Sequence, residues 1–234
     1  MGTSSQVSYR KKVLMLIDLR NVTTRWINLD SATRNAAEMD AQFIKLGLSN
    51  HQRISARRIP PPNIPKVKLR AFGSHFVGCG QSHLDCMASV TGSPLLILED
   101  DAMVTNQFSH TITVPDDTDA VYLGVSHGNA KQIIIDTHTG WYKIMGMLAS
   151  HAILYLSDRY LSAARNIITE SIYTRNIPLD NGLAYLQSKF NVLALPLPMF
   201  VQADSRESAN KWEHLTSNKL IPNHKLVDDM LTII

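Results

Sequence analysis

The chain has 234 residues, which is long enough to bury a large core without disulfides or a structural metal. Its 23 lysines and arginines against 20 aspartates and glutamates leave a formal net charge of +3, which neither requires nor excludes a polyanionic partner. The two cysteines, Cys79 and Cys86, lack the paired spacing of a zinc site and are too few for a disulfide scaffold.

The first half of the chain alternates short apolar runs with segments of helical period. The two N-terminal runs could pair as a hairpin, and Asp30 or Ser31 is expected to cap the helix that follows them, with Gly47 near its end. In chain order we predict strands over 13–19 and 25–29, a helix over 31–48, a strand over 54–56, a helix over 80–89 and a strand over 95–98.

The second half continues the alternation. Asp180 is expected to cap the helix that it opens. In chain order we predict strands over 111–114 and 120–124, a β-ribbon over 133–135 and 142–147, a helix over 150–169 broken near Asp158, a helix over 180–190, a strand over 192–197 and a C-terminal helix over 226–234. Because strands alternate with helices, the fold predicted is α/β, with a mostly parallel central sheet flanked by helices and a late β-ribbon.

The most informative motif is the apolar run 95–98, which ends in the three adjacent carboxylates Glu99, Asp100 and Asp101. The run suits a strand covered on both faces, and ligands of open α/β sheets bind just beyond the carboxyl ends of such strands. Charges buried there require a cation or hydrogen-bond donors, and hard oxygen ligands suit Mg²⁺ or Mn²⁺ carrying a phosphorylated substrate. The alternative is that two of the three only solvate a loop or cap the next helix.

A basic, proline-rich segment extends from Arg53 to Arg70. The prolines at 60–62 and 65 exclude a helix interior or a central strand, so we expect an exposed loop. It is either a solvated loop or a surface for a phosphate-bearing acceptor such as DNA. Its basic residues are Arg53, Arg57, Arg58, Lys66, Lys68 and Arg70.

Several separated segments resemble, in the same order, glycosyltransferase family 25, which includes lipooligosaccharide galactosyltransferases and collagen hydroxylysine galactosyltransferases. They are WINLD at 26–30 with Arg34, RISA at 53–56, GCGQSHL at 78–84, LILEDDA at 96–102 and VYLG at 121–124. Segments 142–152, 178–180 and 200–202 with Ser205 also look like the family's C-terminal pattern. The resemblance covers most of the chain.

The resemblance implies a GT-A-type fold in one domain over 1–234. It places a nucleotide-binding half at about 11–124, an acceptor and catalytic half at about 125–208 and a C-terminal extension at 209–234. The activity it implies is metal-dependent, inverting transfer of a sugar from a nucleotide-sugar donor to a hydroxyl acceptor such as a surface glycan. Mn²⁺ or Mg²⁺ is the implied cofactor, and a UDP-sugar is the donor of first choice.

The resemblance also suggests roles for particular residues. Asp180 is the candidate base that takes the proton of the acceptor hydroxyl, its alternative role being an ordinary N-cap. Asp101 and Asp100 are the candidate metal ligands, and the adjacency of Glu99, Asp100 and Asp101 leaves open which of the three contacts the metal directly. The candidate donor-binding residues are Asn28, Leu29, Arg34, Ser82, His83, Glu99, Asp100 and Gln202.

Not every residue of this set needs to bind the donor. His83 could instead secure the loop beneath the acidic strand, and Arg34 could be a solvated helix residue. Gln202 lies where many GT-A enzymes place a histidine, and its amide is a poorer metal ligand. Asn35 departs from the family, in which a second arginine is frequent at this position.

Other functions stay open. A DNA-modifying glycosyltransferase would act on a hydroxylated nucleobase, although the small net charge speaks against a dedicated duplex binder. The second is a non-catalytic sugar-nucleotide or glycan-binding module, and the presence of Glu99, Asp100, Asp101 and Asp180 argues against it. A metal-dependent phosphohydrolase, suggested by Asp18, lacks a companion aspartate two residues on. We expect a soluble, cytoplasmic protein, since no signal-peptide core and no spanning apolar run is present, and nothing in the sequence indicates its oligomeric state.

Overall fold

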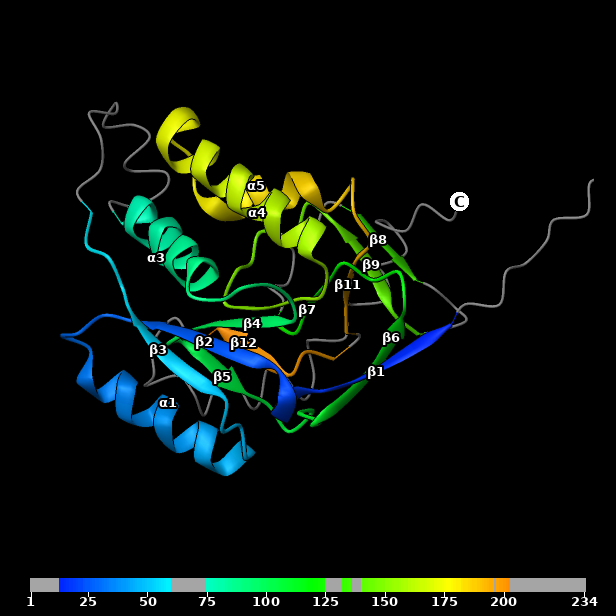
Figure 1. Cartoon of the computed structure of the whole chain (residues 1–234), viewed down its shortest axis with the longest axis horizontal. Helices are drawn as coiled ribbons and strands as arrows, with labels where there is room; N and C mark the ends of the chain where they lie inside the picture. Colours follow the sequence, from blue (N-terminus) through cyan, green and yellow to red (C-terminus); the bar gives the residue numbers. More distant parts are fainter. Residues whose placement is uncertain (1–12, 60–74, 125–131, 136–139, 196, 203–234) are drawn as a thin grey trace, which may run out of the picture.

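The computed structural model describes residues 13–59, 75–124, 132–135, 140–195 and 197–202. Its centre is an eight-stranded sheet of order β3-β2-β4-β10-β7-β11-β9-β8 (Figure 1). All of these strands run in one direction except β9 and β10, so the prediction of a mostly parallel sheet is confirmed. The strands are β2 Thr23–Asn28, β3 His51–Ser55, β4 Leu95–Glu99, β7 Ala120–Tyr122, β8 Gln132–Ile135, β9 Tyr142–Met145, β10 Ala152–Tyr155 and β11 Val192–Ala194.

Helices cover both faces of this sheet. Figure 1 shows α3 (Phe76–Ala88), α4 (Asp158–Glu170) and α5 (Leu179–Leu186) on one side and α1 (Thr33–Leu46) on the other. In β4, Leu95 and Ile97 pack in the cluster with α3, α4 and α5, whereas Leu96 and Leu98 pack in the cluster with α1. Successive side chains of a strand point to opposite faces, so a strand covered on both sides needs a continuous apolar run.

Short elements complete the fold. The turn η1 (Leu19–Asn21) follows β1, and the π-helical turn η2 (Ser171–Arg175) continues α4. The antiparallel pair β1 (Leu14–Asp18) and β6 (Thr111–Pro115) forms one small sheet, and β5 (Ala102–Val104) and β12 (Phe200–Gln202) form another. The second pair matters for the site, because its register sets Gln202 opposite Ala102, immediately after the carboxylates.

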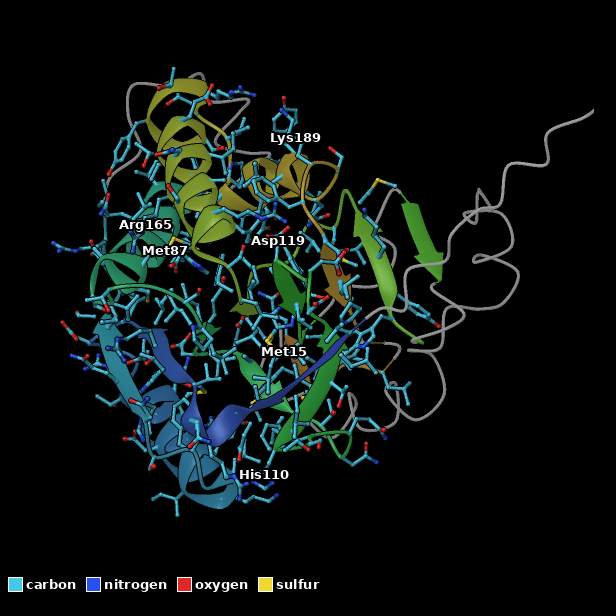
Figure 2. The ribbon with its side chains drawn as sticks, turned by 45° about the vertical axis from the view of Figure 1, so that its right-hand side comes forward. Met15, Met87, His110, Asp119, Arg165 and Lys189 are labelled. Atoms are coloured by element: carbon cyan, nitrogen blue, oxygen red, sulfur yellow. The ribbon has the colours of Figure 1, made fainter. Side chains whose placement is uncertain are left out.

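Helices α3 and α4 are tied together near the end of α3. The guanidinium of Arg165 on α4 donates a hydrogen bond to the carbonyl oxygen of Met87, and Figure 2 shows the two residues side by side. This contact anchors the helix that carries the GCGQSHL segment. Among the described residues, no helix is both long and apolar enough to cross a bilayer.

Two predicted elements are wrong. Strand β1 pairs with β6, and β2 lies between β3 and β4, so the N-terminal strands form no hairpin. The helix predicted over 150–169 begins only at Asp158, because Ala152–Tyr155 is the strand β10 between β4 and β7. All four side chains of β10 are buried, and such a run cannot be told from a buried helix by periodicity alone.

The predicted helix caps also differ from the structure. Helix α1 follows Ala32 without a side-chain cap, while Asp30 accepts hydrogen bonds from Arg53 and Ser55. Gly47 does end this helix, with a positive φ of 61° that suits glycine. Asp180 is not an N-cap, because it lies in the first turn of α5 after Pro178. The predicted C-terminal helix and residues 60–70 of the basic segment lie outside the described residues.

Candidate functional site

The carboxylates at the end of β4 diverge. Oδ2 of Asp100 accepts hydrogen bonds from Nδ2 of Asn28, at 2.6 Å, and from Nδ2 of Asn35, at 2.9 Å. These partners belong to β2 and α1, so this carboxylate is held on the α1 side of the strand end. Glu99 instead contacts α3 and the segment before β10, and Asp101 contacts β12. Both therefore point away from Asp100, because adjacent residues of an extended chain point to opposite sides.

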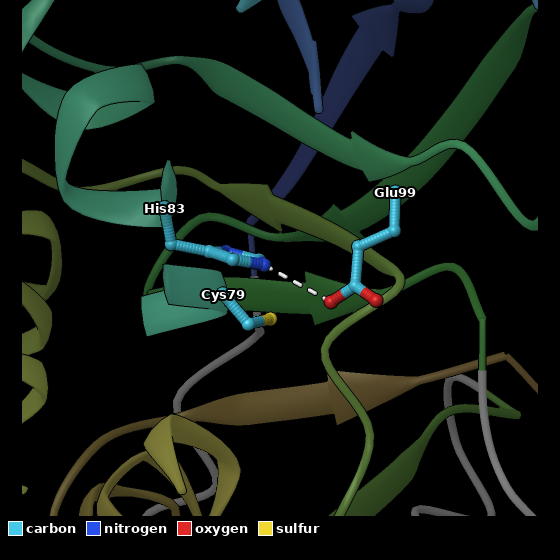
Figure 3. A group of neighbouring side chains, drawn as sticks. All are labelled: Cys79, His83 and Glu99. Carbon is cyan, nitrogen blue, oxygen red and sulfur yellow. Dashed lines mark hydrogen bonds and ion pairs between the residues drawn. The ribbon is translucent and has the colours of Figure 1, made fainter. Parts of the chain in front are cut away.

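Glu99 is held as a fixed negative charge. Its Oε1 accepts a hydrogen bond from Oγ of Ser150 at 2.6 Å and another from Nε2 of His83 at 3.0 Å (Figure 3). Burial alone would raise the pKa of Glu99, but the hydrogen bonds from His83 and Ser150 lower it to about 2. The carboxylate is therefore ionised at neutral pH, and His83 orients it.

Asp101 has one satisfied oxygen and one unsatisfied oxygen. Oδ2 accepts a hydrogen bond from Nε2 of Gln202 at 2.9 Å, whereas Oδ1 is buried without a hydrogen-bond partner among the described residues. Burial and the Glu99 charge raise the pKa of Asp101 to about 7, against the opposing effect of Gln202. A buried carboxylate oxygen without a donor, within the electrostatic range of ionised Glu99, fits a hard divalent cation such as Mg²⁺ or Mn²⁺.

Asp180 is close enough to Glu99 for the charge of Glu99 to affect its pKa. Its Oδ1 accepts hydrogen bonds from the backbone N–H and Nδ2 of Asn181, at 2.9 and 3.0 Å. Burial, together with the Glu99 charge, raises the pKa of Asp180, even though the Asn181 hydrogen bonds lower it. A carboxylate with a raised pKa is a stronger base than a solvated one, as general base catalysis at neutral pH requires.

Three predicted donor-binding residues have other partners. Ser82 is fully buried, donates from its hydroxyl to the carbonyl of Gly78 and accepts from the backbone N–H of Arg57. Arg34 is exposed and pairs with Glu38 one turn along α1, which matches its alternative as a solvated helix residue. Leu29 follows β2, and its carbonyl closes the turn into α1.

Sequence reasoning missed several residues that shape this site. Ser150 and His151 directly precede β10. They were missed because the sequence predicted a helix over this segment. The ring of His151 is fully buried, which lowers its pKa, and it packs so closely on Gly124 that a Cβ there would lie 2.2 Å from Nε2. Asn35 holds Asp100, although the sequence marked it only as a departure from the family.

The described part of the basic segment is paired within the protein. Arg53 contacts Asp30 at 2.7 Å, Arg57 contacts Asp85 at 2.7 Å, and Arg58 donates to Ser31. The proposed nucleic-acid partner gains no support from these three arginines.

We expect Asn28 to stabilise the fold around Asp100. It is 1% exposed, donates to Asp100 and to the carbonyl of Ala32, and accepts from Nε of Arg53. Asn28→Ala should lower the free energy of unfolding by about 1–3 kcal/mol, because buried partners lose their hydrogen bonds. Urea denaturation measures this loss. Asn35→Ala is the matched control, with a smaller expected loss, and equal losses in the two variants would contradict the assignment.

A scan against protein-family models and a search of curated proteins find no match. Among solved structures, the chain is similar to the inositol-1-phosphate CTP transferase from T. maritima, with a TM-score of 0.47 and 11% identity over 86% of this chain and 97% of that one. It is also similar to a glycosyltransferase involved in the glycosylation of the major capsid of PBCV-1, with a TM-score of 0.43 and 11% identity over 82% and 98%. UTP-bound UGPase from Acinetobacter baumannii has a TM-score of 0.37 and 14% identity over 88% and 77%. With TM-scores below 0.5 and identities this low, these likenesses carry no conclusion about the chemistry of this chain.

Proposed function

We propose that the chain is a metal-dependent, inverting glycosyltransferase of the GT-A type, related to glycosyltransferase family 25, that uses a nucleotide-sugar donor. The observation that supports this most is the carboxylate of Asp101, whose buried Oδ1 has no donor among the described residues, beside ionised Glu99 at the carboxyl end of β4. Strand ends of this kind are where α/β proteins bind phosphorylated ligands.

Asp101 and Glu99 would hold the cation. When bound, Mn²⁺ or Mg²⁺ would neutralise the charge that develops on the departing nucleoside diphosphate. Gln202 fixes Asp101 by donating to Oδ2, which leaves Oδ1 for the cation. His83 and Ser150 fix Glu99 in the same way. Holding both carboxylates rigidly in advance lowers the reorganisation that binding and reaction require.

Asp100 and Asp180 would serve the two substrates. Asp100, oriented by Asn28 and Asn35, would contact the nucleotide of the donor on the α1 side. Asp180 would accept the proton of the acceptor hydroxyl as the new glycosidic bond forms and the bond to the diphosphate breaks on the opposite face. The acceptor that we propose is a glycan hydroxyl.

A panel of nucleotide sugars tests the proposal. With Mn²⁺ present, we expect a UDP-sugar to be turned over with release of UDP, and to stabilise the protein against heat because it binds only the native state. EDTA should abolish the release and added Mn²⁺ should restore it. Stabilisation by a nucleotide sugar without release of nucleoside diphosphate, in the presence of glycan acceptors, would instead identify a non-catalytic binding module.

A further inference from the structure

A second donor set of different chemistry lies beside the carboxylates. One ligand atom each from Cys79, His83 and Glu99 lie within 4.8 Å of one another, and Figure 3 shows the three side chains pointing toward a common point. Cys79 and His83 are four residues apart on α3, which brings them to one face of the helix. Glu99 reaches that face from the end of β4.

The surroundings keep these side chains in place. His83 is fully buried, and its Nε2 lies 3.0 Å from Oε1 of Glu99, which Ser150 also holds. Tetrahedral zinc sites place neighbouring ligand atoms roughly 3.3–3.7 Å apart, so the arrangement is already close to that of a bound set. Cys79 itself is partly buried on the same helix.

We propose that Cys79, His83 and Glu99 bind Zn²⁺, with a fourth position open to water. A thiolate, an imidazole and a carboxylate together match the ligands of zinc and are a poor set for Mg²⁺ or Mn²⁺, which favour oxygen. On binding, the Cys79 thiol gives its proton to solvent and the sulfur bonds the metal. His83 binds through a deprotonated Nε2, with its proton on Nδ1, so bonds from Nε2 and from Glu99 to the metal replace the hydrogen bond between them. The site goes beyond the proposed sugar transfer: it shares Glu99 with the donor site, but it needs neither donor nor turnover.

Cobalt substitution tests this site without an activity assay. A thiolate bound to Co²⁺ gives an intense near-ultraviolet charge-transfer band, and the chain has only two cysteines that could produce it. Cys86→Ala is the matched control, because Cys86 is on the same helix but outside the three-residue set. We expect the band in the parent chain and in Cys86→Ala, its loss in Cys79→Ala, and its displacement from the parent chain by Zn²⁺.

Further measurements separate the possible outcomes. If Cys79→Ala does not fold, a second measurement uses the parent chain. Bound Zn²⁺ should protect Cys79 from an alkylating reagent, and mass spectrometry locates the protected cysteine. Absence of the charge-transfer band at saturating Co²⁺, or its persistence in folded Cys79→Ala, would overturn the proposal. Asp101→Asn should keep the band, so the zinc site stands or falls independently of the proposed glycosyltransferase activity.

Discussion

Asp101→Asn is expected to lower metal-dependent release of nucleoside diphosphate at least 10²–10³-fold, the scale on which removal of one key charge-stabilising group acts. The substitution removes the charge of the carboxylate whose Oδ1 has no donor among the described residues, so the cation loses a main ligand. Steady-state kinetics at saturating Mn²⁺ measure the effect. Asp116→Asn, in the exposed turn after β6, is the matched control and should behave like the parent chain. Release by Asp101→Asn at the parent rate would refute the metal assignment.

The same variant separates a functional role of Asp101 from a structural one. The pKa of Asp101 is raised in the folded chain from its ordinary 3.8 to about 7, so ionisation is harder when folded than when unfolded. This cost to stability is absent below the unfolded pKa, grows as the pH rises toward 7 and persists above it. Without metal, Asp101→Asn should therefore raise Tm at pH 8, and the gain should vanish near pH 4. A loss of Tm at pH 8 would indicate that the carboxylate stabilises the fold.

Asp180→Asn is expected to lower transfer to the acceptor about 10²–10⁴-fold, the usual contribution of a general base. Donor binding should be unchanged, because the amide keeps the size of the carboxyl group and Asp180 is not assigned to the donor. Paired assays of transfer and of thermal stabilisation by donor with Mn²⁺ check both halves of this prediction.

Asn181→Ala provides the comparison for Asp180. It removes the Nδ2 hydrogen bond to Asp180 but keeps the carboxylate and the backbone N–H bond, so transfer should persist. Equal loss of transfer and of donor binding in Asp180→Asn would show that Asp180 supports the donor site rather than the acceptor proton.

Much of the fold is predictable from local pattern. The first four residues of β4, 95–98, are all apolar because both faces of the strand are covered, and this made the strand and its carboxylate end recognisable. The ribbon of β8 and β9 was also predicted. Strand β10 was not, because its four buried residues lie directly before a true amphipathic helix, and short apolar runs do not distinguish the two structures.

The site is predictable only in part, since its partners meet through strand order. Glu99 contacts Ser150, 51 residues away, because β10 inserts beside β4. Gln202 contacts Asp101, 101 residues away, because β12 pairs with β5. The set of Cys79, His83 and Glu99 escaped notice for a related reason: cysteine spacing tests for pairs of cysteines, whereas the other ligands here are a histidine and a glutamate.

The central claim is that the carboxyl end of β4 holds a divalent cation that carries the diphosphate of the donor. A crystal soaked with Mn²⁺ and UDP tests it most directly, because manganese can be located by its anomalous scattering. We predict a peak bonded to the carboxylate of Asp101 and to diphosphate oxygens. A fully occupied UDP bound elsewhere, with no peak at Asp101, would contradict the account.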